Sequence, residues 1–294
     1  MPSIAFTSEQ IQQFQEQGFL VLEQFLAPEL VDRVAARLDP LFATQLETGI
    51  YPDEWHGRPG LNQPNATRQM SGLWRCDRTV ASLSLSAEIA RLNATLMGWS
   101  GSRLATDSCW IKPPTAPAVL FHRNNTAVST IAPATLVTCW MALTDTTATM
   151  GSLEVAPASH RWPSRDEFRF LHAPSEDYRL PLWQAAQTAG IEAPEIQPIA
   201  LPAGGCVFLH GDLWHGSGPN RSDRTRRSMA VSTLPAQAQF QPPGVGVGYI
   251  FSRYRRIGDL AMDESFFPIL WTATGYRTPM VDAYCQDGLL TPGK

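Results

Sequence analysis

Residues 206–220 read CVFLHGDLWHGSGPN, and this stretch decides the class of fold. The apolar run Cys206 to His210 is followed by a histidine at position 215, a polar turn over residues 218–223 and a second apolar run, Met229 to Thr233. Short apolar runs separated by Gly, Pro and Asn are typical of antiparallel strands joined by tight turns. The pattern predicts a β-rich domain whose strands fold back on one another.

Other segments after residue 100 show the same pattern of short apolar runs separated by turn residues. The expected strands are Ser108 to Lys112, Val119 to His122, Leu136 to Leu143 and Leu153 to Val155. Together with the first stretch they predict a sandwich or jelly roll over about residues 104–235. The mixed aromatic, charged and proline-rich segment from Trp162 to Pro198 breaks this rhythm and indicates an insertion, of the kind that forms lids or binding loops.

The first hundred residues carry helix signals instead. A Thr7-x-x-Gln10 capping box predicts a helix that ends near Gly18, and the run Phe19 to Leu22 predicts a strand. Pro28 suits a helix start, residues 47–72 are expected to form a loop, and residues 86–98 a further helix. We expect one domain over residues 1–294, with N-terminal helices over about 8–98 and a C-terminal extension over 236–294.

Composition limits the partners. The chain has 294 residues, 44% hydrophobic, 17% charged, with a net charge of −4, which argues against nucleic acid or a membrane surface as a partner. The five cysteines form no C-x-x-C pair, and Met1 to Gln10 do not resemble a signal peptide, so a reducing, cytoplasmic location is expected. The oligomeric state stays open, with a homodimer as one option.

Two histidines at strand-like positions are candidate metal ligands. His122 ends one apolar run and His215 follows another, and a jelly roll can bring such distant residues together. Imidazole nitrogen suits iron, although a hydrogen-bonded structural histidine is the commoner role for such a residue. Arg226 follows on the next expected strand as a planar cation able to bind a carboxylate at two points, and Ser217 offers a hydroxyl beside it.

Several segments, in order, resemble the phytanoyl-CoA dioxygenase family of iron(II)- and 2-oxoglutarate-dependent oxygenases. The resemblance implies a double-stranded β-helix, a jelly roll with flanking helices, and an enzyme that uses Fe(II) and 2-oxoglutarate. It also implies that His122 and His215 bind iron, that Arg226 and Ser217 bind the distal carboxylate of 2-oxoglutarate, and that His160 is structural. The segments are residues 17–22, 111–114, 122–124, 140–145, 151–160 and 215–220 with Arg226.

The first metal motif departs from the family pattern. The family has His-x-Asp, whereas this chain has Asn124 at the third position, which replaces a negative ligand by a neutral amide. Four interpretations follow: an oxygenase with Asn124 as a weak ligand, a halogenase with a halide in that position, a non-redox enzyme such as a cyclase or isomerase, and a binding protein or disabled oxygenase. The apparent 2-oxoglutarate anchor favours the first.

The substrate is expected to be a small, largely apolar metabolite, as in specialised biosynthesis. Aromatic residues near the motifs are candidate pocket residues, although such residues are more often simple core. The C-terminal stretch Tyr249 to Tyr254 is expected to close over the pocket. The candidates are Phe121, Trp140, Tyr178 and Trp183.

Overall fold

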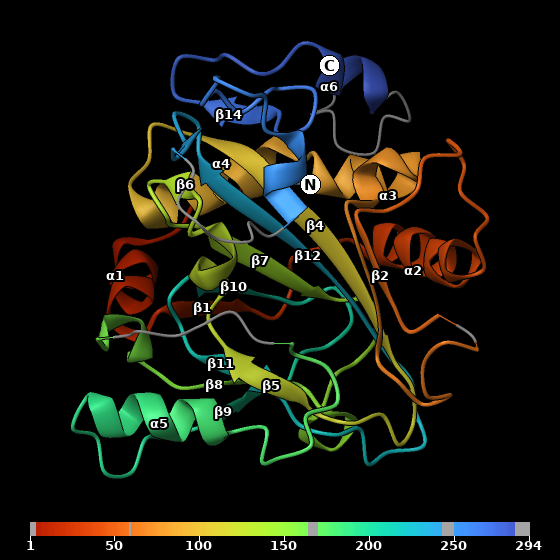
Figure 1. The fold of residues 1–294 in the computed structure, drawn as a ribbon, viewed down its shortest axis with the longest axis vertical. Helices are drawn as coiled ribbons and strands as arrows, with labels where there is room; N and C mark the ends of the chain where they lie inside the picture. Colours follow the sequence, from red (N-terminus) through yellow and green to blue (C-terminus); the bar gives the residue numbers. More distant parts are fainter. Residues whose placement is uncertain (1–3, 59, 164–169, 243–249, 286–294) are drawn as a thin grey trace.

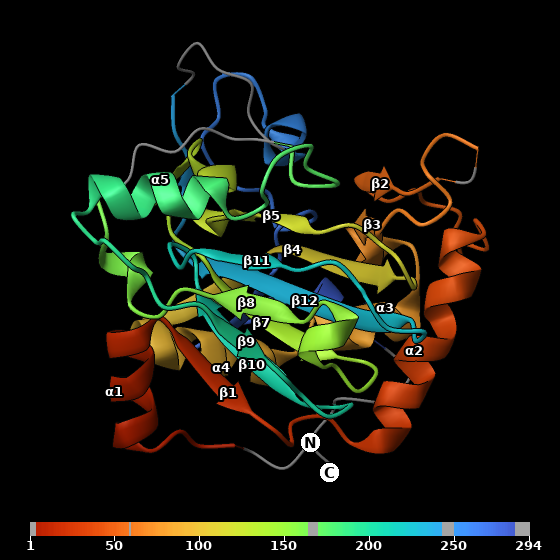
Figure 2. The same ribbon diagram turned by 90° about the horizontal axis from the view of Figure 1, so that it is seen from below.

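The structure, a computed structural model, describes residues 4–58, 60–163, 170–242 and 250–285. Residues 164–169 of the expected insertion, and residues 243–249 and 286–294 of the expected C-terminal extension, lie outside the described residues. Figure 1 shows helices on one side of a β-rich centre, and Figure 2 shows α5 on the opposite side. In the described part of the chain, every helix is too short or too polar to cross a membrane.

Two antiparallel sheets lie against each other and form the jelly roll that the sequence predicts (Figure 2). The larger sheet has the order β1-β10-β7-β12-β4-β3-β2, with β14 paired to β4, and the smaller sheet has the order β5-β11-β8-β9. A short pair, β13 with β6, stands apart. The strands are β1 Phe19–Leu22, β2 Glu54–His56, β3 Arg68–Ser71, β4 Gly101–Lys112, β5 Val119–His122, β6 Ile131–Ala132, β7 Val137–Ala142, β8 Leu153–Val155, β9 Gln197–Ile199, β10 Cys206–His210, β11 His215–Ser217, β12 Arg226–Pro235, β13 Gln239–Phe240 and β14 Ile269–Thr272.

The central strands of the large sheet are largely buried on both faces, and their side chains alternate between two interiors; these strands are β4, β7, β10 and β12. On β7, Cys139 and Met141 pack with the helices, while Trp140 and Ala142 face the smaller sheet. Burial on both faces explains why these strands are continuous apolar runs in the sequence, without the polar alternation of a half-exposed strand. The space between the sheets is the region in which a ligand can be enclosed.

Helices cover the outer face of the large sheet. The first helix begins after the Thr7 capping box and ends at Gly18, which adopts the left-handed conformation (φ 80°), as the local signals predict. Proline at the first turn of α2 and the Ser86 cap of α4 likewise confirm the expected helices. The helices are α1 Ser8–Gln17, α2 Pro28–Phe42, α3 Arg78–Ser84, α4 Ala87–Met97, α5 Leu180–Thr188 and α6 Met280–Tyr284.

One sequence-based expectation is wrong. Residues 47–72, expected as a loop, contain β2 and β3, which extend the large sheet through pairing of β3 with β4. Their residues, Glu-Trp-His and Arg-Gln-Met-Ser, lack the apolar pattern of a buried strand, so it is the neighbouring β4 that holds them in the sheet. The expected C-terminal extension also joins this sheet, because β14 pairs with β4.

Candidate active site

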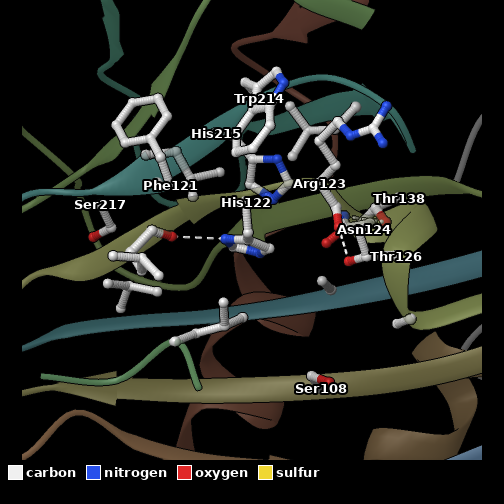
Figure 3. Close-up of a pocket in the computed structure, with 18 of the residues that line it drawn as sticks. Ser108, Phe121, His122, Arg123, Asn124, Thr126, Thr138, Trp214, His215 and Ser217 are labelled. Atoms are coloured by element: carbon white, nitrogen blue, oxygen red, sulfur yellow. Dashed lines mark hydrogen bonds between the residues drawn. The ribbon is translucent and has the colours of Figure 1, made fainter. Parts of the chain in front are cut away.

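A cavity of about 1240 Å³ lies between the two sheets. Its floor is the inner face of β4, β7 and β12, and His122 and His215 line it from the smaller sheet. This volume exceeds the roughly 300–1,000 Å³ typical of ligand pockets. Figure 3 shows the part of the cavity around the two histidines.

The two histidines are direct neighbours. His122 at the end of β5 is the register partner of His215 at the start of β11, and their ring centroids are 4.4 Å apart. Each Nδ1 is hydrogen-bonded, at 2.8 Å, to the carbonyl oxygen two residues earlier, Leu120 O and Leu213 O. A carbonyl can only accept, so each Nδ1 carries the proton and each Nε2 keeps a free lone pair.

Burial keeps both imidazoles neutral, the state that a metal ligand needs. Desolvation lowers the pKa of His122, and desolvation together with the neighbouring His122 lowers the pKa of His215 to about 3. The lone pair of His215 is therefore available throughout the ordinary pH range, and burial shifts His122 in the same direction. Two neutral imidazoles this close together could hold one cation between them.

Asn124 stands beside this pair, at the first position of the short 3-10 helix η2, Asn124–Val128. Its Nδ2 donates to Thr138 Oγ1 at 3.2 Å, and its amide is hydrogen-bonded toward the His122 ring in the sense that raises the pKa of His122. Because Nδ2 is bound to Thr138, the oxygen is the end of the amide that is left for the histidine side. Among the described residues, no three His, Cys, Asp or Glu side chains form a metal cluster.

The expected anion anchor is buried at the other end of the site. Arg226, the first residue of β12, is 2% exposed; its NH1 donates to Ser217 Oγ at 3.2 Å and to Gly151 O, and its Nε has no hydrogen-bond partner. An unpartnered buried guanidinium nitrogen is costly and fits a site for a carboxylate. The guanidinium lies over the Trp140 ring, 5.6 Å from its centroid.

Sequence reasoning missed a second buried cation, Lys112. It is the register partner of Arg226 across β4 and β12, is 0% exposed, and donates from Nζ to Ser217 Oγ at 2.8 Å and to Gly218 O. Desolvation, and then the charge of Arg226, lower the pKa of Lys112 well below its ordinary value. Only the strand register brings the two cations together, and no sequence motif marks that register.

The hydrogen bonds of Ser217 are fully used within the protein. Its hydroxyl donates to Gly151 O at 2.8 Å and accepts from Lys112 and Arg226. A hydroxyl has one proton and two lone pairs, so Ser217 joins the two cations to the backbone. A role of Ser217 in carboxylate binding remains a prediction.

Two of the four aromatic candidates line the cavity, Phe121 and Trp140. Tyr178 and Trp183 are absent from its described lining, which corrects the expectation for them. Tyr178 donates its hydroxyl to Glu154 at 3.0 Å, and Trp183 is 37% exposed on the outer side of α5. For Trp183 the helix phase is the reason, because Pro181, Gln184, Ala185 and Thr188 form the side of α5 that faces the cavity, whereas Tyr178 precedes the helix.

Polar residues stand at another wall. His172 stacks on His56, with ring centroids 4.0 Å apart, and its Nε2 lies 2.7 Å from Gln69 Oε1. All three residues line the cavity, and so does Phe251, from the C-terminal stretch expected to close over it. Tyr249 of that stretch lies outside the described residues.

Asp212 connects the two turns that carry the histidines. It accepts from Arg123 at 3.0 Å and from Asn125 at 2.7 Å, and both donors belong to the segment that follows His122. Asp212 itself lies three residues before His215, in the connection between β10 and β11. This ion pair and hydrogen bond link the ends of β5 and β11 that carry His122 and His215.

Comparison with known proteins agrees with this geometry. The chain is 26% identical over 281 residues to dioxygenase trt7 of Aspergillus terreus, covering 91% of this chain and 83% of that protein. In fold it is similar to the non-heme alpha-ketoglutarate-dependent carbocyclase SnoK from nogalamycin biosynthesis (TM-score 0.68, 22% identity, 90% and 96% of the two chains). It is also similar to the epimerase SnoN in complex with Fe3+, alpha-ketoglutarate and nogalamycin RO (TM-score 0.67, 21% identity, 90% and 98%).

A family model covers most of the chain. The model described as phytanoyl-CoA dioxygenase (PhyH) matches residues 14–228, a range that begins in α1 and ends in β12. This range contains both histidines, Asn124, Lys112 and Arg226. The chain belongs to the phytanoyl-CoA dioxygenase family.

Proposed function

We propose that this protein is a 2-oxoglutarate-dependent oxygenase that holds Fe(II) with His122, His215 and the amide oxygen of Asn124. The observation that carries the proposal is the pair of adjacent imidazoles, each with its Nδ1 tied to a carbonyl and its Nε2 lone pair free. Family membership supports the dioxygenase class, and the structural neighbour SnoN, which forms a complex with Fe3+ and alpha-ketoglutarate, supports the two cofactors.

The protein residues would bind and orient the cofactors. Arg226 has a buried Nε without a partner and would bind the distal carboxylate of 2-oxoglutarate, while Lys112 adds a second positive charge behind Ser217. Iron(II) together with 2-oxoglutarate and oxygen supplies the oxidising chemistry that no side chain can provide. The apolar walls, including Phe121 and Trp140, would exclude water from the reacting C–H bond.

The substrate class follows from the cavity. A volume of about 1240 Å³ leaves room for a molecule much larger than the five-carbon 2-oxoglutarate. Aromatic walls with a polar patch at His56, Gln69 and His172 suit a largely apolar metabolite that carries a few oxygen atoms. SnoK is a carbocyclase and SnoN an epimerase, so ring closure and epimerisation are outcomes to test beside hydroxylation.

The neutral Asn124 favours one alternative, a non-redox enzyme or a binding protein on the same scaffold. The change from aspartate to asparagine removes a negative ligand, and even outer-shell changes cost about 10- to 100-fold in metal affinity. This alternative predicts no specific iron site, whereas the proposal predicts a weak but specific one.

The decisive experiment is an anaerobic titration of the full chain with Fe(II) and 2-oxoglutarate. We expect a weak visible charge-transfer band in the wild-type chain, lost in His215→Ala. Asn124→Asp should tighten iron binding by roughly 100-fold, because the new carboxylate faces the metal. Asn65→Asp is the matched control, since the Asn65 amide bonds Thr115 on a different part of the surface. Absence of the band in both the wild-type and the Asn124→Asp chains would refute the proposal.

A further inference from the structure

The Asn124 amide begins a row of hydrogen-bonded side chains that crosses the floor of the cavity. Its Nδ2 donates to Thr138 Oγ1 at 3.2 Å, and Thr138 Oγ1 is 2.8 Å from Ser232 Oγ. Thr138 on β7 and Ser232 on β12 are register partners, and Thr138 is 4% exposed. Figure 3 shows Asn124 and Thr138 next to each other beside His122.

The two ends of an amide differ in what they can do at a metal site. The oxygen is an acceptor with lone pairs, while the NH2 group is a donor that cannot bind a cation. His122 Nε2 carries a lone pair, so without a cation the amide would gain a hydrogen bond by turning its NH2 toward that nitrogen. After such a turn, the lone pair of His122 Nε2 would accept a hydrogen bond from the amide and could not bind the metal.

Thr138 opposes that turn. In the arrangement seen, Thr138 Oγ1 accepts from Asn124 Nδ2, so the NH2 group is satisfied on the side away from His122, while either hydroxyl can donate in the bond between Thr138 and Ser232. We propose that Thr138 is a positioning residue that holds the Asn124 amide with its oxygen toward His122 and His215. The inference rests on the proposed function, because it assigns Thr138 a task that only the altered ligand needs.

A carboxylate at position 124 would not need this task. Its two oxygens are equivalent, neither can donate to His122, and the hydroxyl row could simply reverse, with Ser232 donating to Thr138 and Thr138 to the carboxylate. Thr138 should therefore matter with Asn at position 124 and matter little with Asp. This dependence distinguishes a positioning role from a merely structural one.

The test measures affinity for cobalt(II) alone, from its visible absorption, in four variants of the full chain. Thr138→Val, which keeps the shape and removes the hydroxyl, should weaken binding about 10-fold, and Thr138→Ser should stay within about threefold of wild type. Between Asn124→Asp and the double variant Asn124→Asp with Thr138→Val, the difference should stay within about threefold. Equal losses in both backgrounds, or no loss with Asn124, would overturn the proposal.

A metal-free measurement separates this proposal from the proposed function. With asparagine-selective 15N labelling, the Asn124 side-chain NH2 signal is assigned by its disappearance in Asn124→Asp. It should shift in Thr138→Val and keep its position in Thr138→Ser, and an unchanged signal in Thr138→Val would overturn the role of Thr138. If no variant binds cobalt, the metal-site proposal fails, while this signal still decides how the amide is held.

Discussion

Replacing Lys112 by methionine should weaken 2-oxoglutarate binding without destabilising the fold. The Lys112 Nζ and Arg226 NH1 both bind Ser217 Oγ, at 2.8 and 3.2 Å, so the two nitrogens are at most about 6 Å apart. If a carboxylate held by Arg226 lies at a similar distance from Nζ, the two opposite charges attract each other. At an effective dielectric constant of about 20, two unit charges about 6 Å apart interact by roughly 3 kcal/mol. We therefore expect Lys112→Met to weaken binding by about 30- to 150-fold, or about 2–3 kcal/mol.

Without ligand, Lys112→Met should be as stable as the wild-type protein or more stable. Lys112 is fully buried beside the like charge of Arg226, so the substitution removes a desolvated cation and a repulsion. Ser217 and Gly218 lose one donor, which costs about 1 kcal/mol and offsets part of that gain. An unchanged or raised melting temperature together with weaker binding would separate the charge effect from damage to the fold.

Binding should also depend on pH in a defined direction. The pKa of Lys112 is lowered, so its charge is present below that lowered pKa and is lost as the pH rises through it, before the ordinary value of 10.5 is reached. Titration calorimetry with 2-oxoglutarate should thus show affinity falling with rising pH in the wild-type chain and changing less in Lys112→Met. The matched control is Arg227→Met, which removes one positive charge from a half-buried residue paired with Asp39. Equal affinities of Lys112→Met and wild type near neutral pH would refute the reasoning.

Two further predictions concern other parts of the molecule. Burial raises the pKa of Asp107 to about 6, and its Oδ1 has no hydrogen-bond partner; the folded state therefore loses stability as the pH rises from about 4 through 6. Asp107→Asn should raise the melting temperature at pH 8, by an amount that corresponds to roughly 3 kcal/mol at most. Near pH 4 the substitution should have little effect on the melting temperature, and a larger effect at pH 4 than at pH 8 would contradict this reasoning. Ala185→Trp should fill the α5 side of the cavity and abolish substrate-dependent succinate release, while 2-oxoglutarate binding stays unchanged. Trp183→Ala, on the outer side of the same helix, is the control and should leave both succinate release and 2-oxoglutarate binding intact. Loss of succinate release in Trp183→Ala would count against the assigned helix faces.

Local signals in the sequence predicted elements whose stability is local. The Thr7 capping box, Pro28 and the Ser86 cap define helix ends, and the apolar runs define strands that are buried on both faces. The strands β2 and β3 escaped prediction because their place depends on pairing with β4, far along the chain. The misplaced Trp183 has a similar cause, since the side of α5 that faces inward is set by packing against the sheet.

The site was predictable only as far as the family resemblance carried individual residues. The strand register places His122, His215 and Arg226 around one cavity. The motifs imply this register, but the sequence does not give it directly. The partners Lys112, Thr138 and Asp212 belong to no motif that indicates their contacts, and each acts through a cross-strand or cross-turn contact. Such contacts become visible only when the register is known.

The distribution of charge in the cavity bears on which interpretation of Asn124 holds. Lys112 and Arg226 are like charges at directly opposed positions of neighbouring strands, an arrangement that destabilises a sheet. Glu154 is close enough to act on Lys112, but it is already bound by Arg179 at 2.9 Å and by Tyr178. A protein that only enclosed an apolar ligand would be more stable without these cations. A dicarboxylate would neutralise both at once, so the charges favour a chain that still binds 2-oxoglutarate.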